Sequence, residues 1–174
     1  MKGETEMNNL PKIFDEFSEA RRDSFIRVKE YKDLGKHIVG TFCTYTPVEV
    51  IYAAGAYPIS LCGMSDETIP DAEKDLPKNL CPLIKSSYGF ALTDKCPFTY
   101  FSDIIVGETT CDGKKKMYEY LSELKPMHVM QLPQAIDRDH AFTVWRNEII
   151  LLIKRLEKEF NVKISDEDLR KAIK

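Results

Sequence analysis

Short apolar segments alternate with amphipathic segments along most of the chain. The clearest apolar segment is Ile104-Ile105-Val106, which has no polar interruption and therefore predicts a strand buried on both faces. Gly107 ends the run, and a turn is expected over residues 108–110. Apolar residues then recur at helical spacing from Met117 to Leu124. This pattern predicts a helix that begins at Cys111.

The same alternation extends to both sides of this segment. Strands are expected at residues 37–42, 57–62, 103–107 and 127–132. Helices are expected at residues 10–34, 47–54, 82–92, 111–124 and 141–160, with a helical turn near 71–74. Alternating strands and helices favour parallel pairing. The predicted fold class is therefore α/β: an open parallel sheet of about four strands with helices on both faces, flavodoxin- or Rossmann-like.

Capping residues predict where several of these helices begin. Thr46 is expected as the N-cap of a helix whose first residue is Pro47. By the same logic Pro82 makes Cys81 the N-cap of the next helix. Ser165 opens a last segment with an acidic residue three positions on, as in a capping box.

Length and composition indicate one ordinary domain with a sizeable core. Of the 174 residues, 43% are hydrophobic and 30% are charged. We expect a helical extension at 1–35, an α/β domain at 36–162 and, at 163–174, the start of a helix leading to a second domain.

The net charge of −3 argues against nucleic-acid binding, and no apolar run reaches the roughly 18 residues of a membrane helix. The polar, acidic start lacks a signal-peptide core, so a cytoplasmic location is expected.

Five cysteines are the main candidates for chemistry: Cys43, Cys62, Cys81, Cys96 and Cys111. They form no CxxC pair, and cytoplasmic thiols stay reduced, so neither a zinc ribbon nor a disulfide framework is indicated. Cys81 and Cys111 are each expected at a helix N-terminus, where thiolates are stabilised and make good metal ligands. Two thiolates are too few for an iron–sulfur cluster, so Cys43, Cys96 or another chain would have to contribute. The alternative is that all five are inert packed thiols.

Other residues carry weaker signals. The three histidines lie in unrelated places, and we assign catalysis to none of them. The basic run Lys114-Lys115-Lys116 would offset the charge of a cluster or meet substrate phosphates, but a solvated helix face is the favoured interpretation for two of the three. No glycine-rich nucleotide-binding motif is present.

Three runs of sequence resemble one protein family. The runs are FCTYTPVEVIYAAGAYPISLCG, DLPKNLCPLIKSSYGFALTDKCPF and DIIVGETTCDGKKKMYEYLSE. They resemble the 2-hydroxyacyl-CoA dehydratase D-component family, which includes benzoyl-CoA reductase subunits and double-cubane cluster proteins. The likeness is close over roughly residues 40–132, and GETTCDGKKKMYE is its most specific part.

The resemblance implies an iron–sulfur enzyme of anaerobic metabolism. Family members hold a 4Fe–4S or double-cubane cluster on cysteine thiolates between two flavodoxin-like domains. An ATP-dependent iron–sulfur activator supplies a low-potential electron, with which dehydratases expel water from a 2-hydroxyacyl-CoA. By resemblance Cys81 and Cys111 are the matching motif cysteines. Cys43 and Cys96 are closer to the double-cubane branch and are further candidate ligands.

The chain is about half as long as family members, and their second domain is missing. The resemblance therefore implies a first domain that needs the rest of the protein, and a homo- or heterodimeric partner subunit, for a complete cluster. Alone it is expected to be inactive. The alternative function is a non-catalytic α/β module that folds or assembles with a partner without a cluster. The substrate and the catalytic residues are not predicted.

Overall fold

The structure is a computed structural model that describes residues 13–63 and 65–173. Its elements are, in chain order, α1 (Ile13–Asp33), β1 (His37–Thr41), α2 (Val48–Ala53), β2 (Ala56–Ser60), α3 (Ile69–Ala72), α4 (Pro82–Leu92), α5 (Pro97–Phe101), β3 (Ile104–Glu108), α6 (Asp112–Leu124), β4 (Met127–Met130), α7 (Ala141–Phe160) and α8 (Asp166–Ala172). The start of the helix expected from residue 10 lies outside the described residues.

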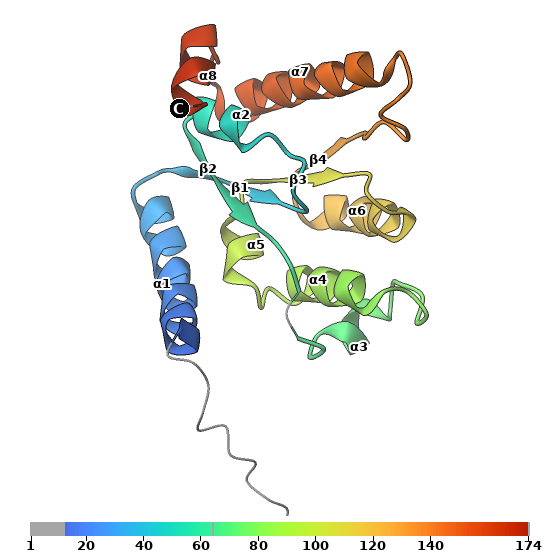
Figure 1. The fold of residues 1–174 in the computed structure, drawn as a ribbon. Helices are drawn as coiled ribbons and strands as arrows, with labels where there is room; N and C mark the ends of the chain where they lie inside the picture. The colour runs from blue at the N-terminus through green and yellow to red at the C-terminus, as the bar shows by residue number, and fades with distance from the viewer. Residues whose placement is uncertain (1–12, 64, 174) are drawn as a thin grey trace, which may run out of the picture.

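The four strands form one sheet in which every pair is parallel. Their order is β2-β1-β3-β4, the order that the first four strands have in flavodoxin-like folds. Helices α2, α7 and α8 cover one face, and α4 and α6 cover the other, with α3 beyond α4 (Figure 1). The predicted α/β fold with a parallel sheet and helices on both faces is confirmed.

Strand β3 lies in the middle of this layered arrangement. Ile104, Ile105 and Val106 are completely buried. Ile104 and Val106 belong to the hydrophobic cluster under α2 and α7, whereas Ile105 belongs to the cluster under α4 and α6. Successive side chains of a strand point to opposite faces, so both faces need apolar residues here. This explains why the segment has no polar interruption.

Three strands end before the predicted residue, and two of them end where their neighbouring strand also ends. Strand β1 ends at Thr41, and Cys43 then adopts a left-handed backbone conformation that turns the chain away. Ser60 is the last residue of β2 because Thr41 is its partner. Strand β4 ends at Met130, which pairs with the last residue of β3.

Gly107 does not end its strand, contrary to the prediction. β3 continues through Gly107 to Glu108, which pairs with Met130. The glycine is explained by a close approach instead: a Cβ atom at Gly107 would lie 2.5 Å from Cζ of the Tyr118 ring. The turn expected at residues 108–110 therefore starts later.

The helix boundaries were predicted with mixed success. Helices 82–92 and 141–160 are confirmed, as are the N-cap position of Cys81 and the capping box at Ser165. Thr46 is not an N-cap: α2 begins at Val48 with Pro47 as its N-cap. The Thr46 hydroxyl instead donates a hydrogen bond to Glu108. The helical turn expected near 71–74 lies at Ile69–Ala72, and α5 forms where no helix was predicted.

Candidate functional site

Two of the candidate cysteines follow neighbouring strands at one edge of the sheet. Cys43 comes shortly after β1, and Cys111 is the N-cap of α6 after β3. Strands β1 and β3 are adjacent, but the helices that follow them cover opposite faces. Such a reversal opens a crevice at the carboxyl ends of the strands, where open α/β sheets bind ligands. We call this edge, with Cys43, Cys81 and Cys111, the cysteine edge.

Cys43 is held in an unusual backbone conformation among polar groups. Its φ of 65° is in the left-handed region, which non-glycine residues rarely adopt. The half-buried Sγ lies 3.5 Å from Oγ1 of Thr110, and Nζ of Lys114 contacts the same sulfur. Lys114 thus places a positive charge directly beside this sulfur. Lys115 and Lys116 instead pair with acidic residues one helical turn away, as expected for a solvated helix face.

Three consecutive residues after the buried strand connect the loops of this edge. Oε1 of Glu108 accepts hydrogen bonds from the backbone N–H of Thr46 at 2.5 Å and from its hydroxyl at 2.6 Å. Oγ1 of Thr109 accepts one from the backbone N–H of Leu132, at 2.9 Å. Thr110 contacts Cys43, as described above. The loops after β1 and β4 are thus both fastened to the end of β3.

Glu108 and Tyr118 are site residues that the sequence reasoning missed. Glu108 is completely buried, and its second oxygen, Oε2, has no hydrogen-bond partner within the described residues. The buried Tyr118 hydroxyl donates to the backbone carbonyl of Glu108, at 3.3 Å. Burial, followed by the nearby Cys43 and Glu108, raises the pKa of Tyr118, so its phenol stays a donor. An acidic residue that directly follows an apolar strand was the available signal for Glu108.

Cys81 reaches the same edge from a different helix. It is the exposed N-cap of α4, which packs against α6. The two helices meet near their N-termini: a Cβ atom added at Gly113 would lie 2.8 Å from Ile84 and 3.0 Å from Leu80. Cys81 directly follows Leu80, and Cys111 is two residues before Gly113. The N-termini of α4 and α6, which carry these two thiols, therefore lie beside each other.

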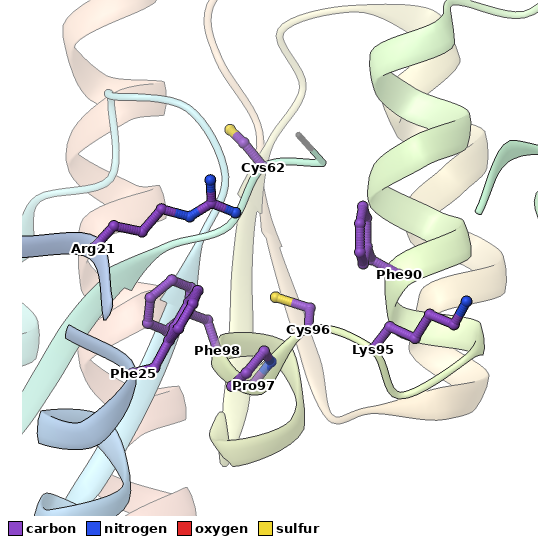
Figure 2. Close-up of a pocket in the computed structure, with 8 residues that line it drawn as sticks. All are labelled: Arg21, Phe25, Cys62, Phe90, Lys95, Cys96, Pro97 and Phe98. Carbon is purple, nitrogen blue, oxygen red and sulfur yellow. The ribbon is translucent and has the colours of Figure 1, made fainter. Parts of the chain in front are cut away.

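Cys96 lies elsewhere, together with Cys62. Both line a small pocket of about 70 Å³ between α1, α4 and α5, with Arg21 and three phenylalanines (Figure 2). Cys81 stands at the start of α4 and Cys96 beyond its end. The 11 residues of α4 span roughly 16 Å at about 1.5 Å per residue. One cubane cluster is too small to bind Cys81 and Cys96 together. A ligand role of Cys96 therefore stays a prediction that rests on the resemblance alone.

Within the described residues, no three side chains of His, Cys, Asp or Glu converge closely enough to hold a single metal ion. The cysteine edge nevertheless offers the donor type that an iron–sulfur cluster uses. Its three thiols come from three separate loops, and two of them stand at helix N-termini. A cluster is larger than one ion and bridges more widely spaced thiolates. The donor set fits part of a cluster's ligands.

Comparison with known proteins gives the family. Residues 43–174 match the family model described as "2-hydroxyglutaryl-CoA dehydratase, D-component". The chain belongs to the 2-hydroxyglutaryl-CoA dehydratase D-component family. The matched region contains the whole cysteine edge, and it confirms the family suggested by the three sequence runs.

The chain is also similar in sequence to three individual proteins. The chain is 58% identical over 167 residues to YjiM of Escherichia coli (strain K12), which is named as a dehydratase subunit. It is 25% identical over 171 residues to the (R)-phenyllactyl-CoA dehydratase beta subunit of Clostridium sporogenes. It is also 25% identical over 169 residues to the lactoyl-CoA dehydratase subunit beta of Anaerotignum propionicum. Each match covers 96% of this chain.

The chain spans less than half the length of these relatives: 44% of YjiM, 45% of the phenyllactyl-CoA dehydratase subunit and 44% of the lactoyl-CoA dehydratase subunit. None of the helices in residues 13–63 and 65–173 combines the length and apolar composition needed to cross a membrane.

Proposed function

We propose that Cys43, Cys81 and Cys111 supply thiolates to an iron–sulfur cluster in a 2-hydroxyacyl-CoA dehydratase-like enzyme. The observation that carries the proposal is the placement of Cys43 and Cys111 after the adjacent strands β1 and β3, with Cys81 at the start of α4, the helix that packs against α6. Membership of the dehydratase D-component family supports the same chemistry. The cluster, of cubane or double-cubane type, would supply low-potential electrons for dehydration or reduction of an acyl-CoA.

Helix N-termini and one lysine make the cysteine edge suitable for thiolates. The free N–H groups of α4 and α6 point toward their N-caps, Cys81 and Cys111, and favour negative charge there. Helix α6 has 13 residues, so its dipole is well developed. Lys114 brings a cation to the third thiol, Cys43. Together these groups would stabilise an anionic cluster, whose thiolates and sulfides carry net negative charge.

The rest of the enzyme would come from outside the described residues. Three thiolates are one fewer than a cubane ligated only by cysteine requires. A further thiolate or a substrate oxygen would complete the coordination, from the remaining length that the relatives possess or from a partner subunit. An ATP-dependent iron–sulfur activator would deliver the electron. Relatives named as beta subunits support the existence of partner subunits.

A second candidate function is a non-catalytic α/β module that assembles with a partner and holds no cluster. It is favoured by the absence, in the described part of the chain, of three metal-binding side chains that converge on one point. Under this interpretation Cys81 and Cys111 are solvent-exposed thiols at loop ends, and the contact of Lys114 with Cys43 has no chemical role.

Anaerobic reconstitution with iron and sulfide distinguishes the two functions. We would measure iron, sulfide and visible absorbance in this chain, and in a chimera that continues into the remaining part of YjiM. Cys111→Ser should lose most of the bound iron. The matched control is Cys62→Ser, another exposed cysteine that follows a strand but lies in the pocket of Figure 2; it should keep its iron. A chimera that stays colourless, or a Cys111→Ser chimera with full iron content, would establish the second function.

A further inference from the structure

An apolar hollow of about 400 Å³ opens beside the cysteine edge. Its wall comes from three places: the loop after β1, the segment after β4 and the first turns of α7. The side chains that form it are Tyr45, Leu132, Pro133, Ile136, Phe142 and Trp145. None of the described residues that line it is charged, and the volume is within the usual range of small-ligand pockets.

The rim of the hollow leaves large apolar side chains uncovered. Ile136 is 94% exposed, Phe142 is 77% exposed and Tyr45 is 59% exposed. Single exposed apolar residues are common, but three around one concave surface are typical of a binding site. Covering these side chains removes apolar area from water, and this favours an apolar ligand.

The hollow and the cysteine edge share the same backbone framework. Tyr45 lies in the loop that carries Cys43, and Glu108 anchors this loop through the next residue, Thr46. Leu132, on the opposite wall, donates its backbone N–H to Thr109, two residues before Cys111. Two of the three segments that shape the hollow are thus fastened to the segment that leads to the proposed cluster ligand.

We propose that this hollow binds the apolar acyl or aryl group of the substrate and thereby selects its chain length. The assignment to a CoA thioester rests on the proposed function, whereas the binding of an apolar group does not depend on a cluster. Each methylene moved from water into an apolar site contributes about 0.8 kcal/mol. We therefore expect the dissociation constant to fall about three- to fourfold for each methylene that enters the hollow.

The protein contains one tryptophan, Trp145, and it lines the hollow. Its fluorescence therefore reports on this site alone. We would titrate this chain with straight-chain acyl-CoA thioesters of increasing length, with the matching free carboxylates, and with CoA alone. The expected result is a Trp145 signal that saturates with acyl-CoA, tightens with chain length and is absent with CoA alone.

A matched pair of variants on α7 tests the location. Phe142→Ser removes an exposed wall residue and should weaken binding by about tenfold or more, as expected for the loss of an aromatic contact. Leu151→Ser removes an apolar residue that is 49% exposed on the same helix but outside the hollow. It should leave the dissociation constant unchanged. Both positions are exposed, so both variants are expected to fold.

Four results would overturn the inference. Affinity that does not depend on acyl length would show that no apolar group enters the hollow. Equal binding of CoA alone would place recognition elsewhere, and equal binding of free carboxylates would remove the thioester assignment. A Trp145 signal that changes with protein concentration but not with acyl-CoA would identify a protein interface instead. None of these results depends on iron, so they are distinguishable from a failure of the proposed function.

Discussion

Replacing Glu108 should destabilise the protein by disconnecting the loop that carries Cys43. Glu108 is completely buried, and one of its oxygens accepts both the backbone N–H and the hydroxyl of Thr46. Thr46 is itself buried. In Glu108→Ala both donors would lose their acceptor in a place that water does not reach.

The magnitude follows from the number of donors left without a partner. A buried donor that loses its acceptor costs about 1–3 kcal/mol. Two such donors would cost more, but the variant also removes Oε2, a buried oxygen that already has no partner in the described structure. We therefore expect Glu108→Ala to lower the free energy of unfolding by about 2–4 kcal/mol. For a chain of this length the loss corresponds to a decrease of about 5–15 °C in Tm.

Urea denaturation and thermal unfolding would measure the loss. Glu108→Gln keeps one carbonyl acceptor for Thr46 and should lose less than half as much. Glu119→Ala serves as the matched control, because Glu119 is exposed and, among the residues that the structure describes, forms its ion pair with Lys116 alone. Its effect should stay within about 0.5 kcal/mol. The pair Glu108→Ala and Thr46→Val should be non-additive by at least about 0.5 kcal/mol, since the two residues share hydrogen bonds.

Two results would refute this reasoning. If Glu108→Ala unfolds at the same urea concentration as Glu119→Ala, the hydrogen bonds to Thr46 contribute no net stability. If the effects of Glu108→Ala and Thr46→Val simply add, the two residues do not act through their shared contact. In either case the loop that carries Cys43 is held by something other than Glu108.

Three further predictions concern other parts of the fold. Gly89→Ala should cost at least about 2 kcal/mol by urea denaturation, because its Cβ would lie 2.2 Å from the backbone oxygen of Thr68. Gly113→Ala, whose Cβ would meet only side-chain atoms, should change stability by less than about 1 kcal/mol; equal losses would contradict the argument. Burial lowers the pKa of His128, so the unfolded state binds the proton first and stability should fall as pH drops below about 6.5. His128→Gln should weaken this dependence, and an unchanged slope would assign it to other groups. Ser165→Ala should cost about 1 kcal/mol by removing a capping box, and a loss near zero would show that this box adds no stability.

The sequence alone determined the fold class and most of its elements. Uninterrupted apolar runs and helical periodicity are local signals, and they identified the four strands and the long helices 82–92 and 141–160 correctly. Local chemistry also predicted the N-cap position of Cys81 and placed the start of a helix at Cys111, one residue before the observed start, because a proline after a cysteine and an acidic first turn act within a few residues. The motif runs predicted the family.

Only the tertiary structure decided how the site is assembled. Thr46 has the chemistry of an N-cap, but Glu108, 62 residues away, takes its hydroxyl as a hydrogen-bond donor. In the sequence, Gly107 predicts the end of a strand. In the folded protein, the strand continues through Gly107, and the ring of Tyr118 packs closely against it.

The tertiary structure also decided which cysteines lie near each other and which lie apart. Cys81 and Cys96 both precede a proline and read alike in the sequence, yet the length of α4 separates them. Strand order likewise brings the residues after β1 and β3 into contact, although most of the chain between Cys43 and Cys111 lies elsewhere. Pairing between strands that are distant in the sequence determines where these cysteines lie. The local pattern of apolar and polar residues carries no information about that pairing.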